Sequence, residues 1–157
     1  MIATTMGAEI PGGTRLSYDN KGALQRDHQF SMCAVDSLGI CSTVRNGFGM
    51  GDQAKAFTLV TGIEMDDTGL KIAAERIINL ERMYNARMGF SRKDDTLPDR
   101  ILNTPVPSGP SKGETLDLGP MLDEYYSLMG WDMNGIPAVE KLKGLGINIS
   151  GDHCGVE

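Results

Sequence analysis

The sequence predicts a mainly α-helical, irregular domain whose helices are joined by long ordered loops. The strongest indication is a central segment in which apolar residues recur at steps of three and four, the period of an amphipathic helix. Glycine contributes 20 of the 157 residues, nearly twice the usual share of ~7%, which implies many turns. Four prolines within 13 residues, from Pro98 to Pro110, exclude regular helix from that stretch.

Size and cysteine content indicate a domain that needs no covalent reinforcement. At 157 residues the chain is long enough to bury one hydrophobic core, either alone or as part of a larger protein. Its three cysteines are an odd number at irregular spacing, which favours a reducing compartment over a disulfide framework. We therefore expect a cytoplasmic protein.

Charge and hydropathy argue against nucleic acid and membrane as partners. The formal net charge is −6, and the 15 basic residues are scattered along the chain instead of forming a stripe. No apolar run approaches the roughly 18 residues of a spanning helix, and residues 1–9 lack the basic start and long apolar stretch of a signal peptide. We expect neither kind of partner.

The N-terminal part of the chain predicts two helices separated by a glycine-rich break. Residues 1–20 hold turn residues without a sustained period, so we expect an incomplete N-terminal segment of irregular structure. Residues 21–34 follow a weak helical pattern that stops at Asp36-Ser37-Leu38-Gly39, a turn that would expose Asp36 and Cys41. Asp52 is expected to cap a further helix of about ten residues. Its apolar members are Ala54, Phe57 and Val60.

The clearest element is an amphipathic helix from about Thr68 to Met88. Its apolar stripe consists of Leu70, Ala73, Ile77, Leu80, Tyr84 and Met88. Asp67 or Thr68 can cap its start and Gly89 stops it. Arg82 and Arg87 lie toward its C-terminal end, where the helix dipole favours cations.

The C-terminal part of the chain predicts a long loop followed by two helices. Residues 90–116 read as irregular, and a helix is expected from Asp117 to Met129, with Pro120 in its first turn and Gly130 at its end. Its inward-facing members are expected to be Met121, Leu122, Tyr125 and Leu128. A short helix should run from about Ala138 to Lys143. These elements define a helical domain over residues 21–147, and residues 148–157 are expected to form a frayed tail.

The segment Asp36-Ser37-Leu38-Gly39-Ile40-Cys41 is the best candidate for chemistry. A carboxylate, a glycine that permits a tight turn and a thiol can together hydrogen-bond a polar ring system and ligate a soft metal. The alternative is that Cys41 is a buried cysteine packed beside a helix.

Other candidate clusters are weaker. The spacing of Cys33 and Cys41 matches no common zinc or iron–sulfur pattern, so we expect Cys33 to lie in the core. A zinc site from His28, Cys33, His153 and Cys154 would require the tail to fold back, and the sequence does not favour it. The Gly47-x-Gly49-x-Gly51 run lacks the lysine of a phosphate loop. The run from Arg92 to Asp95 is expected to neutralise itself or to dock on neighbouring helices.

Five separated motifs together resemble a known family. They are Asp36-Ser37-Leu38-Gly39-Ile40-Cys41; Asn79-Leu80-Glu81-Arg82-Met83-Tyr84-Asn85; the stretch from Gly89 to Pro98; Leu122-Asp123-Glu124-Tyr125-Tyr126 with Gly130-Trp131-Asp132; and Gly135-Ile136-Pro137. In order and spacing they resemble the C-terminal, helical part of the tungsten-containing aldehyde ferredoxin oxidoreductase family over roughly residues 3–147.

The resemblance implies an oxidoreductase with two cofactors. In the family, a tungsten or molybdenum bis-pterin oxidises an aldehyde to an acid, and a [4Fe–4S] cluster passes the electrons to ferredoxin. By position, Asp36 would accept hydrogen bonds from the pterin, and Gly39 and Ile40 would bring the backbone close to it. Cys41 would be the metal ligand, bound to cluster iron. No residue of this chain is expected to be catalytic.

The resemblance also marks what the sequence lacks. The other three cluster cysteines belong to a Cys-x-x-Cys-x-x-x-Cys run that is absent here, and Ile10 stands where the family has a histidine near the metal. Isoleucine cannot transfer a proton, which favours reductive branches of the family. The isolated chain is therefore expected to be inactive, its partners being the rest of the enzyme or a separate subunit, ferredoxin and a small-molecule substrate. The alternative is a stand-alone helical module or split subunit without a cofactor.

The remaining motifs have structural interpretations. We expect an ion-pair scaffold from Arg82, Arg92, Asp94, Asp95 and Asp132, and a core cluster from Tyr125, Tyr126 and Trp131. Ala138 stands after Pro137, where the resemblance to the family implies a threonine. Without the threonine hydroxyl, the following helix would lose an N-cap hydrogen bond worth about 1 kcal/mol.

Overall fold

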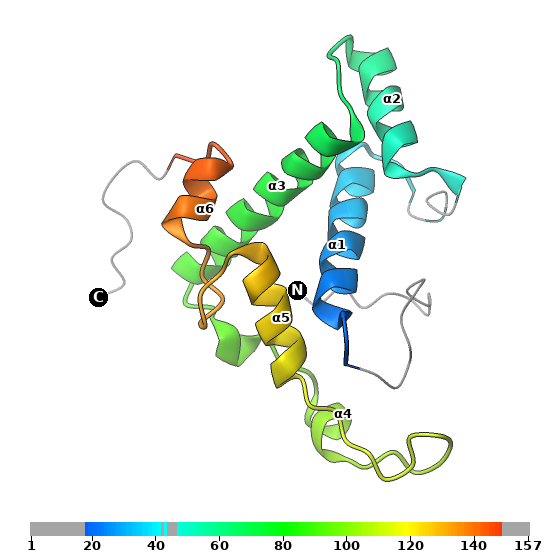
Figure 1. The fold of residues 1–157 in the computed structure, drawn as a ribbon, viewed down its shortest axis with the longest axis vertical. Coiled ribbons are helices and arrows are strands. Elements are labelled where there is room, and N and C mark those ends of the chain that lie inside the picture. The colour runs from blue at the N-terminus through cyan, green and yellow to red at the C-terminus, as the bar shows by residue number, and fades with distance from the viewer. Residues whose placement is uncertain (1–17, 42, 44–46, 149–157) are drawn as a thin grey trace.

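The computed structural model describes residues 18–41, 43 and 47–148, and within them it is helical (Figure 1). Its elements are α1 (Lys21–Ser37), α2 (Met50–Thr61), α3 (Asp67–Arg87), the 3₁₀ helix η2 (Arg92–Asp94), α4 (Asp99–Asn103), α5 (Gly119–Met129) and α6 (Val139–Gly144). The described part contains no strand, only an isolated antiparallel bridge between Trp131 and Pro137. The predicted fold class is confirmed. Residues 1–17 and 149–157, which include Ile10, His153 and Cys154, lie outside the described residues.

Helix α1 is longer than predicted, because it continues past residue 34 to Ser37. No side chain of its own caps its start. Instead, Glu124 of α5 accepts hydrogen bonds from the backbone N–H groups of Gly22 (2.8 Å) and Ala23 (3.4 Å). A carboxylate at a helix N-terminus satisfies free donors and favours the dipole. Gly22 also permits this contact, since a Cβ there would lie 2.6 Å from the backbone nitrogen of Tyr125.

Helix α3 forms as predicted, but a different face of it is buried. Asp66, not Asp67 or Thr68, caps its start by accepting a hydrogen bond from the N–H of Gly69 (2.7 Å). The buried residues of the helix are Leu70, Ala74, Ile78, Asn79 and Arg82. Three members of the predicted stripe are exposed: Leu80 (52%), Tyr84 (65%) and Met88 (63%). Helix α1 packs against the row of α3 residues formed by Leu70, Ala74 and Ile78.

Helix α2 begins earlier than predicted, at Met50. Gly49 occupies its N-cap position, and Asp52 lies in the first turn instead of capping it. Ala54 is buried against Ala34 of α1 and Leu70 of α3. Toward the other end of the helix, Val60 is 86% exposed. The helix therefore packs on α1 and α3 mainly through its N-terminal half (Figure 1).

The region from residue 90 to 129 departs from prediction in two places. One turn of helix, α4, forms after Pro98, which sits at the N-cap, where its missing N–H removes no helical hydrogen bond. Helix α5 starts at Gly119 and buries Tyr126 and Met129, whereas Leu128 is 37% exposed. Its other predicted inward residues, Met121, Leu122 and Tyr125, are half-buried. They face a cavity described below.

The core follows one side of α3. One cluster joins Phe30 of α1, Ala74 and Ile78 of α3, and Met129 of α5, and another joins α1, α2 and α3. Helix α6 adds Leu142, which is fully buried. Ala138 is its N-cap and makes no side-chain cap, as predicted. Among the described helices, none combines the length and the apolar character that spanning a membrane requires.

Candidate functional site

Helix α1 ends in a turn whose backbone conformation favours glycine at position 39. Gly39 adopts a positive φ of 68°, a conformation that favours glycine. Its N–H donates to the carbonyl of Asp36 (3.1 Å), and the N–H of Ile40 donates to the carbonyl of Val35 (3.1 Å). This pair of bonds is the Schellman motif. Because both N–H groups are engaged, Gly39 and Ile40 can offer a ligand only their carbonyl oxygens.

The turn presents Asp36 and Cys41 to the surface. Both residues are exposed, as the sequence predicts, so the alternative of a buried Cys41 is wrong. The Cys41 Sγ lies 3.0 Å from the Thr43 Oγ1. Hydrogen bonds from the Thr43 hydroxyl and backbone lower the pKa of the Cys41 thiol. A lowered pKa favours the thiolate, which is the form that binds metal.

Cys33 has the opposite environment. It lies on α1, half-buried against the Phe30, Ala74, Ile78 and Met129 cluster, with its Sγ 3.8 Å from the carbonyl oxygen of Ala74. Burial raises the pKa of its thiol, and the nearby charges of Glu81 and Asp36 raise it further. Cys33 therefore packs against the core as predicted, at its edge, and is a poor metal ligand.

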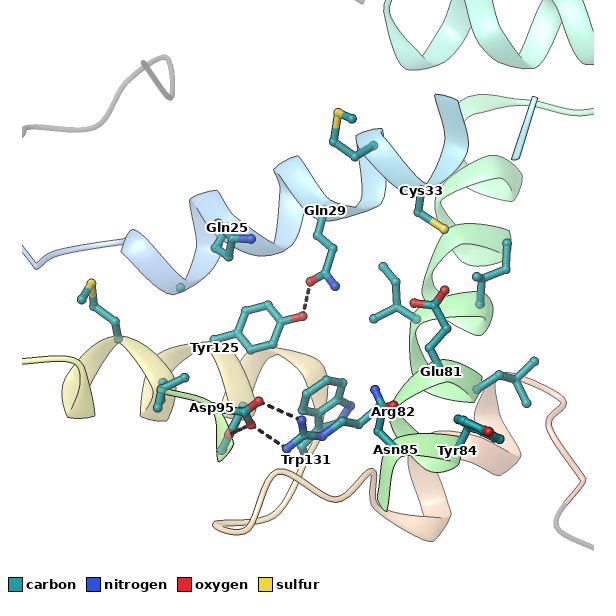
Figure 2. A pocket seen from close by; sticks show the side chains of 18 of the residues that line it. Gln25, Gln29, Cys33, Glu81, Arg82, Tyr84, Asn85, Asp95, Tyr125 and Trp131 are labelled. Atoms are coloured by element: carbon teal, nitrogen blue, oxygen red, sulfur yellow. Dashed lines mark hydrogen bonds and ion pairs between the residues drawn. The ribbon is translucent and has the colours of Figure 1, made fainter. Parts of the chain in front are cut away.

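A cavity of about 1060 Å³ lies between α1, α3 and α5. We call it the groove (Figure 2). One wall is the face of α1 that carries Gln25, Gln29 and Cys33; α5 with Tyr125 lies opposite this face, and α3 closes the groove at the side. Asp36 and Ser37, at the C-terminal end of α1, also line it. The groove therefore reaches the turn that presents Asp36 and Cys41.

A buried ion pair lies at the edge of the groove. Arg82 of α3 donates two hydrogen bonds to the carboxylate of Asp95 (3.0 and 2.6 Å) and one to the carbonyl of Gly135 (2.6 Å). The Tyr126 hydroxyl donates to the same carboxylate. The two charged side chains are only 7% and 16% exposed. Breaking such a pair costs about 3–5 kcal/mol, because one charge stays buried.

The predicted ion-pair scaffold is only partly ionic. Arg82 and Asp95 pair as expected, but Arg92 pairs with Asp123 of α5 (2.6 Å), which the prediction did not include. Asp94 accepts a hydrogen bond from the N–H of Ser91 (2.8 Å), and Asp132 accepts one from the N–H of Ile136 (2.8 Å). Arg92 thus docks on a neighbouring helix, whereas Asp94 and Asp132 stabilise turns.

The predicted aromatic cluster forms beside this pair. The ring centroids of Tyr125 and Trp131 lie 5.5 Å apart, and those of Tyr126 and Trp131 lie 5.7 Å apart. Burial raises the pKa of both tyrosines above the ordinary value. Both therefore stay neutral donors. Tyr126 is buried, whereas Tyr125 and Trp131 are half-buried and line the groove.

Sequence reasoning missed two polar partners of this cluster. The Tyr125 hydroxyl donates to the side-chain oxygen of Gln29 (Figure 2), and the Trp131 indole N–H donates to the side-chain oxygen of Asn79 (2.9 Å). Asn79 is fully buried. An amide within the apolar pattern of α3 was the available signal, since buried amides need partners.

Within the described residues, no group of three or more His, Cys, Asp or Glu side chains could hold a metal ion. A cluster with four cysteine ligands therefore cannot be built from these residues alone. The turn nevertheless has the donor set that such a cluster and a pterin would need from one side. It offers an accessible thiol of lowered pKa, together with a carboxylate and the carbonyl oxygens of Gly39 and Ile40, none of which accepts a hydrogen bond from a described residue.

Comparison with known proteins links this geometry to a family. Residues 2–147 match the family described as aldehyde ferredoxin oxidoreductase, domains 2 & 3. The tungsten-containing aldehyde ferredoxin oxidoreductase of Pyrococcus furiosus is 40% identical over 114 residues, which are 72% of this chain and 19% of the relative. The corresponding enzyme of Pyrococcus horikoshii is 41% identical over 115 residues, with the same shares of both chains. The chain thus spans about a fifth of the length of these relatives.

Two further relatives carry other names. The WOR-like subunit of an aliphatic sulfonate oxidoreductase from Pyrococcus furiosus is 34% identical over 125 residues, which are 71% of this chain and 19% of the relative. Among solved structures, the active site complex BamBC of benzoyl coenzyme A reductase, in complex with 1,5-dienoyl-CoA, matches with a TM-score of 0.71 at 26% identity. That match covers 91% of this chain and 21% of the solved one.

Proposed function

Because this chain belongs to the aldehyde ferredoxin oxidoreductase family, we propose that it supplies one side of the cofactor site of a tungsten-dependent oxidoreductase. In this proposal Asp36, Gly39 and Ile40 face a pterin, and Cys41 is one of four ligands of a [4Fe–4S] cluster. The rest of the enzyme, on the same polypeptide or a separate one, supplies the other ligands. The turn after α1 is the observation that carries the proposal.

The turn suits a pterin because it presents acceptors. The ring system of a pterin carries N–H donors, which require carboxylate or carbonyl oxygens. Asp36 provides an exposed carboxylate, and the Schellman bonds leave only the carbonyl oxygens of Gly39 and Ile40 available. The negative end of the α1 dipole lies at the same turn and favours donors over anions. Ile40 contributes through its backbone, so these groups do not depend on the identity of its side chain.

Cys41 suits an iron–sulfur cluster because its thiol is accessible and its pKa is lowered. Iron–sulfur clusters are held by thiolates, and hydrogen bonds near the sulfur tune their potential. When bound, the cluster would supply one-electron transfer, for which a ferredoxin is the proposed partner. Thr43 would then orient the ligand and donate toward its sulfur. The chain contributes binding and orientation, and no described residue is assigned a catalytic step.

The substrate is proposed only as a small molecule. The relatives are named for an aldehyde, an aliphatic sulfonate and a benzoyl coenzyme A thioester. All three names denote an oxidoreductase or a reductase. The exposed free thiol at Cys41 is compatible with a reducing cytoplasm, which we propose as the compartment.

The test replaces Cys41 by alanine in the assembled enzyme and measures iron content and the electron paramagnetic resonance of the reduced cluster. Loss of one of four thiolate ligands should degrade the cluster and remove most of the iron and the signal. Cys33→Ala is the matched control, because this cysteine is also on the α1 side of the site but packs against the core.

Equal iron content and an unchanged spectrum in the Cys41→Ala enzyme would show that Cys41 is not a cluster ligand. Loss of iron in both variants would point to general instability. Circular dichroism of each variant separates that outcome from ligand loss.

A further inference from the structure

Helix α3 is apolar on two faces, and only one of them is covered. Its core face runs through Leu70, Ala74 and Ile78. A second row, Ala73, Ile77, Leu80, Tyr84 and Met88, follows steps of four, three, four and four. Such alternating steps place side chains on one seam of the kind that a second helix packs against. The later members of this row are the ones that remain exposed.

The second row continues into the groove. Ile77, Leu80 and Tyr84 line it from α3, while Met121, Leu122 and Tyr125 line it from α5. Side chains from both helices therefore line the same cavity, and Figure 2 labels Tyr84 of α3 and Tyr125 of α5 among them. Tyr84 is 65% exposed and Leu80 is 52% exposed, although soluble proteins rarely leave large contiguous apolar patches uncovered.

Two observations indicate what covers this surface. The chain spans only 19% of the length of its curated relatives, so enzymes of this family contain a large part outside the matched region, and that part can cover the surface. The groove also reaches Asp36 and Ser37, which adjoin the turn that the proposed function places against cofactors. The surface beside that turn is consequently the one that faces the rest of the enzyme.

We infer that the groove is the docking site of an amphipathic helix from the part of the enzyme outside this sequence. The occupant places apolar side chains at helical spacing against Leu80 and Tyr84, which line the groove, and against Met88, which follows them in the second row, in the manner of a helix bound in an apolar groove. Glu81 lies at the rim of the groove, so a donor or cation on the occupant would face it. This inference rests on the proposed function, since docking would also bring the remaining cofactor ligands to Cys41.

Hydroxyl-radical footprinting tests the inference without any substitution. The chain alone and the assembled enzyme are each exposed to hydroxyl radicals, and mass spectrometry gives the oxidation rates of the Tyr84 and Met88 side chains in both samples. Met133 is about as exposed as Met88 (70% against 63%) and belongs neither to the groove nor to the second row of α3, so it is the matched reference for Met88. We expect Tyr84, which lines the groove, and Met88, the next member of the second row, to be oxidised several-fold more slowly in the assembled enzyme, relative to Met133.

Equal relative rates in the two samples would overturn the inference. Protection in the chain alone, together with a dimeric mass by light scattering, would overturn it in favour of a second copy. Protection that appears only on addition of a small-molecule substrate would overturn it in favour of a ligand pocket. Iron and tungsten are measured in the same assembled sample, so an enzyme with full cofactors but an unprotected groove refutes the inference while leaving the proposed function intact.

Discussion

At the scale of single residues, Cys33 and Cys41 show how local contacts separate two chemically identical side chains. Cys33 is half-buried near the carboxylates of Asp36 and Glu81, and these surroundings raise the pKa of its thiol. Cys41 is exposed and receives hydrogen bonds from Thr43, which lower its pKa. The difference matters because only the thiolate is a good nucleophile and metal ligand.

The rate of alkylation by iodoacetamide should therefore rise at a lower pH for Cys41 than for Cys33. As pH rises, the thiolate of Cys41 forms first, because its pKa lies below the ordinary value while that of Cys33 lies above it. The measurement is the pH midpoint of the alkylation rate of each peptide, followed by mass spectrometry.

Thr43→Val is the matched control for this titration. It removes the hydroxyl donor and should move the Cys41 midpoint upward, toward that of an ordinary cysteine, without changing Cys33. Coincident midpoints in the parent chain, or a Cys41 midpoint indifferent to Thr43→Val, would contradict the assigned hydrogen bond.

At the scale of elements, the hairpin between α5 and α6 is joined to α3 through Gly135. This residue has a positive φ of 76°, and its carbonyl accepts a hydrogen bond from Arg82. A Cβ there would lie 2.2 Å from the Arg82 Nη2 and 2.9 Å from the Tyr126 ring. Glycine is thus required both by the backbone conformation and by the buried ion pair that lies against it.

Gly135→Ala should destabilise the chain by about 3–5 kcal/mol, because Arg82 must leave its position against Asp95. Gly89→Ala is the matched control. Gly89 also has a positive φ, 86°, but nothing lies within 4 Å of its added Cβ. Only backbone strain of roughly 1–2 kcal/mol should apply there. Urea unfolding followed by circular dichroism measures both, and equal losses would refute the role of the ion pair.

At the scale of the whole molecule, the turn after α1 and the groove belong to one surface. Asp36 contributes to both. The chain contains three cysteines, of which Cys33 packs against the core and Cys41 is exposed. A four-thiolate cluster cannot be completed from that number. The proposed site is consequently shared with another part of the enzyme.

The isolated chain, prepared anaerobically, should therefore contain no stoichiometric [4Fe–4S] cluster and no stoichiometric tungsten. The same chain assembled with the rest of the enzyme should contain both. Inductively coupled plasma mass spectrometry gives the metal content of each sample. Four irons and one tungsten in the isolated chain would contradict the division of the site.

Much of the local structure could be predicted from the sequence. The period of α3, its end before Gly89, and the turn at Gly39 depend on contacts between residues close in the chain, where propensity and capping act directly. The exposure of Asp36 and Cys41 followed from that turn. The end of α1 was less predictable, because the weak apolar pattern of residues 21–34 gave no signal for the three further residues of the helix, of which only Val35 is buried.

The sequence by itself determined that the chain is helical and that a carboxylate and a thiol flank a glycine turn. Only the tertiary structure decided which apolar row of α3 is buried, since two rows one residue apart fit the helical period almost equally well. Packing of α1 and α5 selected the row through Leu70, Ala74 and Ile78. It left the row through Leu80 and Tyr84 facing the groove. The cap of α1 by Glu124 and the pairing of Arg82 with Asp95 likewise join separate elements, and local periodicity carries no information about such contacts.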